Sequence, residues 1–348
     1  MRPSGTFRTG YGRDMALVQT KTQWGLLAAF LVCIALLPLL LDAVWLTWVN
    51  FTLITLVAVM GLNVVTGMAG QFNLGQAALV LVGGYASGIL SKEAGLPFLA
   101  TLPLSCIIAG LAGVLVGFSS LRMTGFYLGI ATFAFHELVV FGIRHGGDFT
   151  GGVWGLSGLP DPSIGGVPLD TDTRMFYVIL LAAVAAVVFT VNLGRSRVGR
   201  AFEGIKQNWM AAQSMGVNVY RYKLLAFFIG SALAGLAGCL LVGYLGFASF
   251  EMVTIMDSIW YLGMMIVGGW GSVLGAILGV VGLELVKQVI SMHGLSIAST
   301  IAFLPFERIS SLVVVVYGLL IVLFLSFRPH GLVSVWNTFK TRYRQWPL

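Results

Sequence analysis

Long runs of apolar residues, separated by short polar or glycine-rich breaks, occupy most of this chain. A helix that spans a bilayer needs about 20 predominantly apolar residues, and about ten segments approach that length. The pattern therefore predicts an all-α, polytopic membrane protein with about ten transmembrane helices. The predicted helices cover roughly residues 24–41, 44–66, 74–90, 97–118, 126–143, 174–192, 224–246, 256–270, 273–291 and 309–327.

The composition agrees with this pattern and excludes an ordinary soluble domain. Hydrophobic residues make up 58% of the chain and charged residues 9%, whereas a soluble domain carries about 25% charged residues. Cys33, Cys106 and Cys239 lie in apolar runs without paired spacing, so we expect small core residues and no disulfide framework. The run 24–41 is long and no small-residue cleavage site follows it, so we expect a retained first helix.

Positive charge is concentrated in three polar segments, and it predicts the orientation of the chain. Cytoplasmic loops carry an excess of Lys and Arg, so we expect a cytoplasmic N-terminal tail (1–23), a transmembrane domain (24–327) and a cytoplasmic C-terminal tail (328–348). The loop 193–223 is cytoplasmic too, and the Asp-containing loop 144–173 lies outside. The net charge of +7 thus reflects topology rather than nucleic-acid binding. Of the 20 Lys and Arg residues, the 14 in these three segments are Arg2, Arg8, Arg13, Lys21, Arg195, Arg197, Arg200, Lys206, Arg221, Lys223, Arg328, Lys340, Arg342 and Arg344.

An even number of helices satisfies this charge distribution, whereas an odd number would place one basic segment on the wrong side. Ten helices fit, and eight with re-entrant pieces remain an alternative, because segment 74–90 and the closely joined pair 256–270 and 273–291 are the weakest candidates.

Four amide side chains lie within or beside membrane segments, at a stretch that glycines interrupt. They are Asn63, Gln71, Asn73 and Gln76. Backbone at membrane depth must find internal partners, so broken helices occur where they are buried or line a wet path, and transporters build sites in this way. The four amides therefore predict a translocation path, and the alternative is that they simply tie helices together.

Two further polar features lie in the membrane segments. Glu137 is a candidate path residue, because ionisable groups there are functional candidates by default; a structural contact is the alternative. His136 precedes it and points about 100° away on a helix. Glu284 and Lys287 stand three residues apart and predict a structural ion pair.

Small residues at four-residue spacing predict close helix packing. Gly271, Gly275 and Gly279 form one such row on the ninth predicted helix, and Ser231 to Gly235 and Ala234 to Gly238 form two on the seventh.

The basic loop 193–223 is patterned like a capped amphipathic helix, which a mere connector does not need. Ala211 and Ala212 lie on a predicted short helix that ends at Gly216, with Arg200 and Arg221 on either side. Small residues let a helix enter a groove of a partner, and the cations hold it at the membrane surface. This loop therefore predicts a docking element; a solvated basic loop is the alternative.

Motifs for catalysis or nucleotide hydrolysis are absent from the sequence. It contains no Gly-x-x-x-x-Gly-Lys-Ser/Thr loop, no Gly-x-Ser-x-Gly elbow and no His-Glu-x-x-His motif. The histidines are dispersed without metal-ligand spacing. We therefore expect no catalytic residue, metal or cofactor on this chain, and any energy for transport must come from a partner or an ion gradient.

Six motifs in order over roughly 60–332 resemble one family, the branched-chain amino acid permease subunits of bacterial ATP-binding-cassette importers, and most closely the longer of its two paired types. They are Gly61-Leu-Asn63 with Gly70-Gln71 and Leu74–Ala78; Leu121-Arg122 with Gly125, Tyr127 and Ile130–Thr132; Thr150–Gly152 with Gly155-Leu156; Gly199–Ala201 through Ala211-Ala212, Met215-Gly216 and Tyr222–Leu224; Gly268–Gly275; and Phe327–Leu332.

The resemblance implies a permease in the bacterial inner membrane, paired with a second, homologous permease. It also implies two cytoplasmic ATPase subunits that hydrolyse ATP and a periplasmic or lipid-anchored substrate-binding protein. Loop 193–223 resembles the ATPase-coupling loop. Met210 and Gln213 stand where the family commonly has acids, so docking is expected to depend more on shape and on the flanking cations.

Three alternatives to a branched-chain amino acid importer stay open. Related permeases with similar motifs carry urea or other small polar solutes. An ATPase-independent channel or transporter would be active without partners. An intramembrane enzyme would need a catalytic pair, for which His136 and Glu137 are the nearest candidate.

Overall fold

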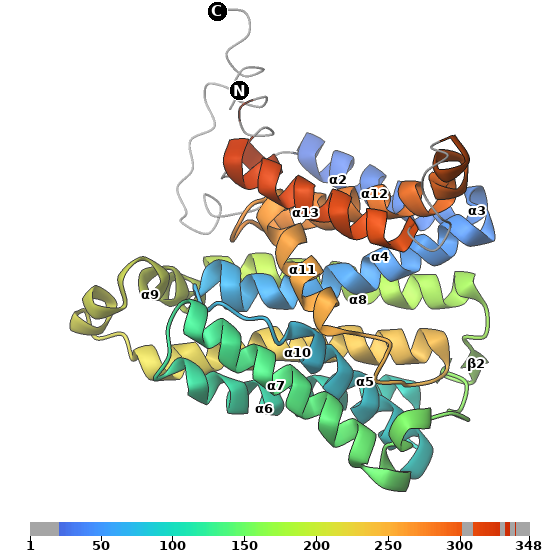
Figure 1. Ribbon diagram of the computed structural model, residues 1–348, viewed down its shortest axis with the longest axis horizontal. Helices are drawn as coiled ribbons and strands as arrows, with labels where there is room; N and C mark the ends of the chain where they lie inside the picture. The colour runs from blue at the N-terminus through green and yellow to red at the C-terminus, as the bar shows by residue number, and fades with distance from the viewer. Residues whose placement is uncertain (1–20, 301–308, 328–330, 335–337, 339–348) are drawn as a thin grey trace, which may run out of the picture.

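The computed structural model describes residues 21–300, 309–327, 331–334 and 338, and these form a bundle of α-helices (Figure 1). Each of the ten predicted apolar segments falls on helical residues. The helices are α2 (Lys21–Ala35), α3 (Leu37–Leu40), α4 (Ala43–Leu62), α5 (Gln76–Glu93), α6 (Phe98–Ser120), α7 (Phe126–His145), α8 (Asp172–Arg195), α9 (Arg197–Ser214), α10 (Val219–Leu245), α11 (Ile255–Gly268), α12 (Val273–Thr300) and α13 (Ile309–Phe327).

Six helices of the described chain are long and apolar enough to cross a membrane: Ala43–Met68, Phe98–Ser120, Phe126–His145, Asp172–Arg195, Val219–Leu245 and Val273–Met292. Helix α11 is shorter, with 14 residues. The first predicted helix, 24–41, is not one continuous helix. It divides into α2 and α3 near Pro38, because proline cannot donate the backbone hydrogen bond that a continuous helix needs.

Helix α10 lies at the centre of the packing, and small residues let α5 and α6 approach it closely. A Cβ added to Gly235 would lie 2.5 Å from Cβ of Ala109 on α6. One added to Gly83 of α5 would lie 2.6 Å from the carbonyl oxygen of Gly235. The small-residue rows predicted on this helix therefore pack within the chain, as expected for helices in lipid.

The second predicted small-residue row needs a correction. Gly275 and Gly279 do lie on α12 and face α11, since a Cβ on Gly275 would lie 2.8 Å from the carbonyl oxygen of Gly268. Gly271 is not on the helix, however. It belongs to the turn before α12 and has φ +78°, a left-handed conformation that favours glycine.

The cysteines differ from one another more than the sequence suggested. Cys239 is buried, as predicted for a core residue, but Cys106 is only partly buried and Cys33 is exposed. The prediction of a core position is therefore wrong for Cys33. An apolar run on a membrane helix does not reveal which side faces the bundle, because lipid is as apolar as the core.

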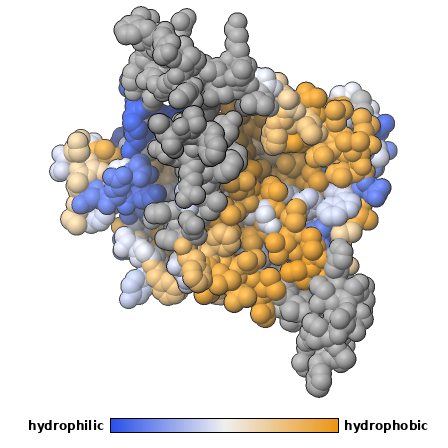
Figure 2. Space-filling view, turned by 90° about the horizontal axis from the view of Figure 1, so that it is seen from above, coloured by the Kyte–Doolittle hydropathy of each residue, from blue (hydrophilic) through white to orange (hydrophobic). Residues whose placement is uncertain are grey.

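The two polar regions of the described chain lie at opposite ends of the bundle. Helix α9 forms one end, and the hairpin of β1 (Ser163–Ile164) and β2 (Val167–Pro168) lies at the other (Figure 1). In Figure 2, hydrophobic residues cover most of the middle, and hydrophilic residues gather towards these ends. This arrangement matches a protein that spans a bilayer, with 144–173 and 193–223 on opposite sides.

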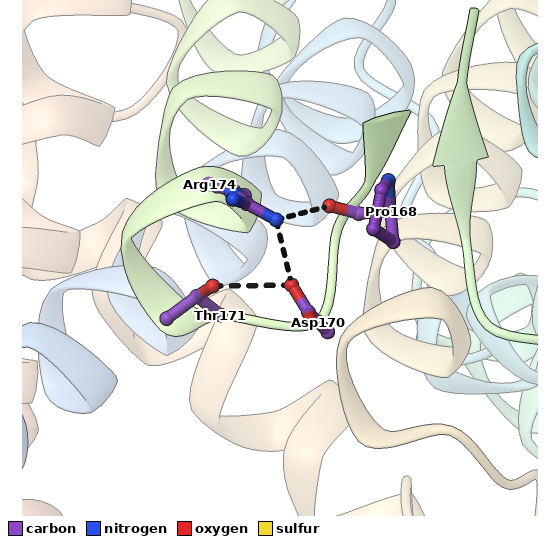
Figure 3. A network of polar contacts seen from close by, with 4 residues as sticks. All are labelled: Pro168, Asp170, Thr171 and Arg174. Atoms are coloured by element: carbon purple, nitrogen blue, oxygen red, sulfur yellow. Dashed lines mark hydrogen bonds and ion pairs between the residues drawn. The ribbon is translucent and has the colours of Figure 1, made fainter. Parts of the chain in front are cut away.

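The segment 144–173 is folded onto the helices. It contains two 3₁₀ turns, Gly147–Phe149 and Gly152–Trp154, before the hairpin. Arg174 at the start of α8 donates to the carbonyl oxygen of Pro168 and pairs with Asp170, both at 3.0 Å (Figure 3). The Thr171 hydroxyl also donates to Asp170, so this network ties the hairpin to α8.

Candidate functional site

The helix break predicted in the glycine-interrupted stretch around the four amides is present. Helix α4 continues into a π-helix, Asn63–Met68, and regular helix resumes only at Gln76. Gly70 has φ +67°, which a side chain would strain. A Cβ on Gly67 would lie 2.9 Å from Cα of Gly271, so the break packs directly against the turn before α12.

Three of the four predicted amides have partners inside the chain. Gln76 donates to the carbonyl oxygens of Ala58, at 3.0 Å, and Gly230, at 3.4 Å, and so joins α4, α5 and α10. Asn73 donates to Oε1 of Gln76 at 3.2 Å. Gln71 donates to the carbonyl oxygen of Ala69 at 3.1 Å. The bond from Gln71 satisfies a backbone oxygen within the break, and the bonds of Gln76 tie α5 to α4 and α10, so these amide donors have partners at membrane depth.

Asn63 differs from the other three amides. Its side chain is fully buried, and neither its oxygen nor its nitrogen has a hydrogen-bond partner among the described residues. A buried polar group without a partner costs about 1–3 kcal/mol, so its retention needs a reason other than the stability of this chain. Asn63 is therefore the amide of this group whose hydrogen-bonding capacity is unused among the described residues.

Helix α7 separates the two residues of the only candidate catalytic pair. His136 is 2% exposed and faces the bundle, whereas the neighbouring Glu137 is exposed. Phe133 and Phe141 lie on the same outer side as Glu137 and are also exposed. A carboxylate in the middle of an apolar helix is costly when it faces lipid, so this side of α7 is expected to meet protein or water.

Loop 193–223 forms a bent helix. Asn208 has non-helical angles, φ −157° and ψ 102°, within α9. Its side-chain oxygen accepts hydrogen bonds from the backbone N–H groups of Met210 and Ala211, both at 3.1 Å. Asn208 thus caps a new helical segment, which ends at Ser214, two residues before Gly216 with φ +88°.

The two alanines of this segment face different ways. Ala211 is exposed, as expected for a docking residue, but Ala212 is buried against Ile205 and Val219. Ala212 therefore supports the bend from inside, because the chain folds back on itself at Asn208. Arg200 and Arg221 are exposed on either side of the segment.

Large apolar residues stand out on the surface of this polar region, and the sequence interpretation did not use them as docking residues. Trp209 is 47%, Met210 62%, Met215 85% and Tyr220 59% exposed. Exposed apolar groups rimmed by charge mark protein interaction sites. Large apolar residues within a basic loop are visible in the sequence and could have identified this surface.

Helix α9 also reaches the helix break. A Cβ on Gly70 would lie 3.0 Å from Cγ of Lys206, and one on Gly271 would lie 3.2 Å from its Nζ. Lys206 is therefore wedged against both the break and the turn before α12. A displacement of α9 would be transmitted to both.

A second cluster of polar side chains lies inside the helix bundle, and the sequence predicted only two of its members. Glu284 and Lys287 form the predicted ion pair, with Oε2 and Nζ 3.9 Å apart. Asp257 of α11 lines the same cavity, together with Trp260. Asp257 and Trp260 are far from 284 in sequence, so only the packing of α11 on α12 brings them together. The described residues contain no cluster of His, Cys, Asp and Glu that could hold a metal ion.

The order of these features along the chain agrees with a known family. The model of the branched-chain amino acid transport system permease component matches residues 44–325. The chain belongs to this family. The permease family member LivM, the high-affinity branched-chain amino acid transport system permease protein of Escherichia coli (strain K12), is 32% identical over 336 residues, covering 89% of this chain and 74% of LivM.

Two other relatives show how far the similarity extends. The probable branched-chain amino acid transport permease protein LivM of Methanocaldococcus jannaschii is 26% identical over 79% of this chain and 88% of that protein. The autoinducer 2 import system permease protein LsrC of Yersinia enterocolitica is 28% identical over 51% of this chain and 50% of LsrC. No solved structure matches the chain. The family is one of transport permeases, and this permease is a multi-pass membrane protein by its apolar helices.

Proposed function

We propose that this chain is the membrane-spanning permease subunit of an ATP-driven importer of branched-chain amino acids. The observation that carries the proposal is the family match over 44–325, supported by relatives of the same description at 32% identity. These relatives favour branched-chain amino acids over urea as the solute.

The proposal includes the partners that the family implies. A second, homologous permease completes the membrane part, two cytoplasmic ATPases hydrolyse ATP, and a periplasmic or lipid-anchored binding protein delivers the amino acid. The protein lies in the bacterial cytoplasmic membrane with about ten helices and with both tails in the cytoplasm. The basic residues of α9 and of the tails support this orientation.

Loop 193–223 is the proposed ATPase-coupling element. The exposed Trp209, Met210 and Met215 supply apolar contacts, and Arg200 and Arg221 supply charge. Closure of the ATPases on ATP would push α9 as one unit. Lys206 then carries this motion to Gly70, so the helix break and the turn before α12 move together.

The helix break is the proposed wall of the translocation path. Asn63, Gln71, Asn73 and Gln76 are its proposed path residues: the last three hold the break, and Asn63 has amide atoms left for a solute. Glu137 lies on the exposed side of α7, which the second permease or the path itself would cover. Movement of the break relative to α7 would open the path to one side of the membrane at a time.

The first experiment is a tagged pull-down from membranes of the native host, with mass spectrometry of the proteins recovered. We expect a second permease and two ATPases. The purified complex is then reconstituted into liposomes with the binding protein, and ATP-dependent uptake of radiolabelled leucine is measured.

Uptake that needs ATP and is inhibited by isoleucine and valine would support the proposal. Transport by this chain alone without ATP would favour the channel alternative. ATP-dependent uptake of urea in place of leucine would contradict the proposed substrate.

A further inference from the structure

A cavity of about 390 Å³ lies among α4, α5, α10, α11 and α12. Its volume falls within the range of about 300–1,000 Å³ typical of small-molecule sites. It contains charged side chains of both signs, which is unusual at membrane depth. The charged and aromatic residues that line it are Asp257, Trp260, Tyr261, Glu284 and Lys287.

The ion pair lies well along α12, away from the start of that helix. Glu284 is 11 residues after Val273, the first residue of α12, which corresponds to about 17 Å along a helix. The hydrocarbon core of a bilayer is about 30 Å thick. The start of α12 lies next to Lys206 of α9, at one polar end of the bundle, so the cavity is remote from that end. It lies towards the loop between α10 and α11, whose Phe247, Met252 and Val253 also line it.

Packing fixes the positions of the ion pair. Glu284 is 7% exposed, and its backbone oxygen accepts a hydrogen bond from the indole of Trp48 at 3.2 Å. Nζ of Lys287 lies 4.6 Å from the ring centroid of Trp260, in a cation–π contact. Trp260 in turn stacks on Tyr317, with ring centroids 5.5 Å apart.

Asp257 adds a second carboxylate to the cavity. It lies in the first turn of α11, where one of its oxygens accepts from the backbone N–H and the hydroxyl of Thr254, at 2.7 and 2.9 Å. This capping box holds the side chain in place. Asp257, Glu284 and Lys287 together carry a net charge of −1, which favours a ligand with a cationic group in a medium of low dielectric constant.

The rest of the cavity is apolar. The apolar side chains of Ile54, Ala58, Val80, Leu241 and Met264 line the same cavity as the charged residues. An aliphatic side chain of the leucine or valine type would find hydrophobic surface there, which binding in a pocket of this kind requires.

A route into the cavity lies between α4 and α12. A second cavity of about 570 Å³ is lined by Val44, Thr47 and Trp48 of α4 and by Gln288 and Ser291 of α12. Phe51, Glu284 and Lys287 line both cavities. The ion pair and Phe51 therefore separate an outer groove from the inner cavity.

We propose that the inner cavity binds the transported amino acid in its zwitterionic form. The ammonium group binds between Asp257 and Glu284, the carboxylate binds Lys287, and the aliphatic side chain lies against Ile54 and Met264. The inference rests on the proposed function. It means that the permease itself recognises the amino acid, in addition to the binding protein that delivers it.

The test measures binding of radiolabelled leucine to the purified complex of permeases and ATPases, without the binding protein. We expect saturable binding that Lys287→Met and Asp257→Asn each weaken about 10- to 100-fold, the effect of losing a hydrogen bond to a charged group. Lys287→Arg keeps the cation and should restore most of the affinity. The control is Lys92→Met, which changes an exposed lysine at the other polar end and should bind as the unaltered complex does.

Competition with two analogues separates recognition from a structural role. Isopentylamine lacks the carboxylate and 4-methylpentanoate lacks the ammonium group. Lys287→Met should reduce the preference for leucine over isopentylamine, and Asp257→Asn should reduce the preference over 4-methylpentanoate. A structural defect would weaken all three ligands alike, and that result would overturn the proposal. Asp257→Asn keeps a side-chain oxygen that can accept the hydrogen bonds from Thr254. This variant is therefore expected to fold even if Lys287→Met does not.

Transport by the complete importer keeps this inference distinct from the proposed function. If the unaltered importer takes up leucine but its permeases show no saturable binding, or if both variants bind normally, the cavity is not the site and the proposed function stands. If the unaltered importer does not take up leucine, both fail.

Discussion

At the scale of single residues, the buried amides of the helix break have two distinct roles. Gln76 bridges the carbonyl oxygens of two other helices, whereas Asn63 has no partner for its amide among the described residues. Replacing a buried group that forms hydrogen bonds leaves its partners without them. Replacing a buried polar group that forms none removes the cost of its desolvation. Stability and transport should therefore respond in opposite ways at these two positions.

Asn63→Leu is expected to leave the stability of the purified protein unchanged or to raise it. Leucine uptake should fall at least about tenfold, because the solute loses a hydrogen-bonding partner in the path, an effect of about 1–3 kcal/mol in free energy. Thermal unfolding in detergent and uptake in liposomes are the two measurements. Normal uptake by this variant would show that Asn63 does not contact the solute.

Gln76→Leu is the matched change at a bonded amide. It leaves the carbonyl oxygens of Ala58 and Gly230 without this donor, so we expect a loss of about 1–3 kcal/mol and a lower midpoint of thermal unfolding. An unfolding midpoint equal to that of the unaltered protein would mean that the amide does not hold the helices together.

At the scale of elements, the bend of α9 decides which residues face outward. Asn208 leaves the helical conformation and caps the segment that follows. The bend buries Ala212 and exposes Trp209 and Met210. Spacing alone suggested a face of two small residues, which the bend divides.

Asn208→Ala removes this cap, and the substitution of an N-cap typically costs about 1 kcal/mol of local stability. Because the bend positions the exposed apolar residues, we expect less leucine uptake per bound ATPase and little change in overall unfolding. Gln207→Ala, at an exposed neighbouring position whose side chain bonds only Glu203 among the described contacts, is the control. Equal losses in the two variants would argue against a role for the bend.

Met215→Asp tests the docking surface itself, at the most exposed of its four apolar residues. Placing a charge within the exposed apolar group should reduce the ATPase recovered with the permease by about tenfold or more, because a buried unpaired charge is costly. Quantitative pull-down is the measurement. Met123→Asp makes the same change at a 45% exposed methionine in the turn between α6 and α7 and should retain the ATPases; equal loss in both would contradict a specific surface on α9.

At the scale of the whole molecule, the polar regions at the two ends of the bundle fix how the protein sits in the membrane. The net positive end contains α9, and the end with Asp161 and Asp170 contains the hairpin. The positive-inside rule relates this asymmetry to orientation. The positions of the two polar ends in the structure do not depend on this rule, because they result from how the helices pack.

This orientation predicts the accessibility of cysteines introduced at each end, after Cys33, Cys106 and Cys239 are replaced by alanine. A membrane-impermeant maleimide should label Asp161→Cys in intact spheroplasts and should label Arg200→Cys only after the membrane is opened. Both native side chains are exposed. The reverse pattern would invert the proposed topology.

The sequence by itself determined the class of protein, the position of nearly every helix, the interrupted stretch with its glycines and amides, and the family. These conclusions depend on local properties of the chain, namely the length of apolar runs, the positions of glycines and amides, and the distribution of charge. None of them requires knowledge of which segments contact one another. The same local signals identified loop 193–223 as a helix and paired Glu284 with Lys287, three residues apart.

Only the tertiary structure decided which side of each helix is covered. In lipid, apolar residues occur on both the inner and the outer side of a helix, so periodicity does not separate them. That is why Cys33 was expected in the core. Ala212 was expected on the surface for another reason, because the sequence does not show the bend at Asn208 that buries it. Packing of α11 against α12 also brought Asp257 and Trp260 to Glu284 and Lys287, since groups distant in sequence meet only when the helices that carry them do.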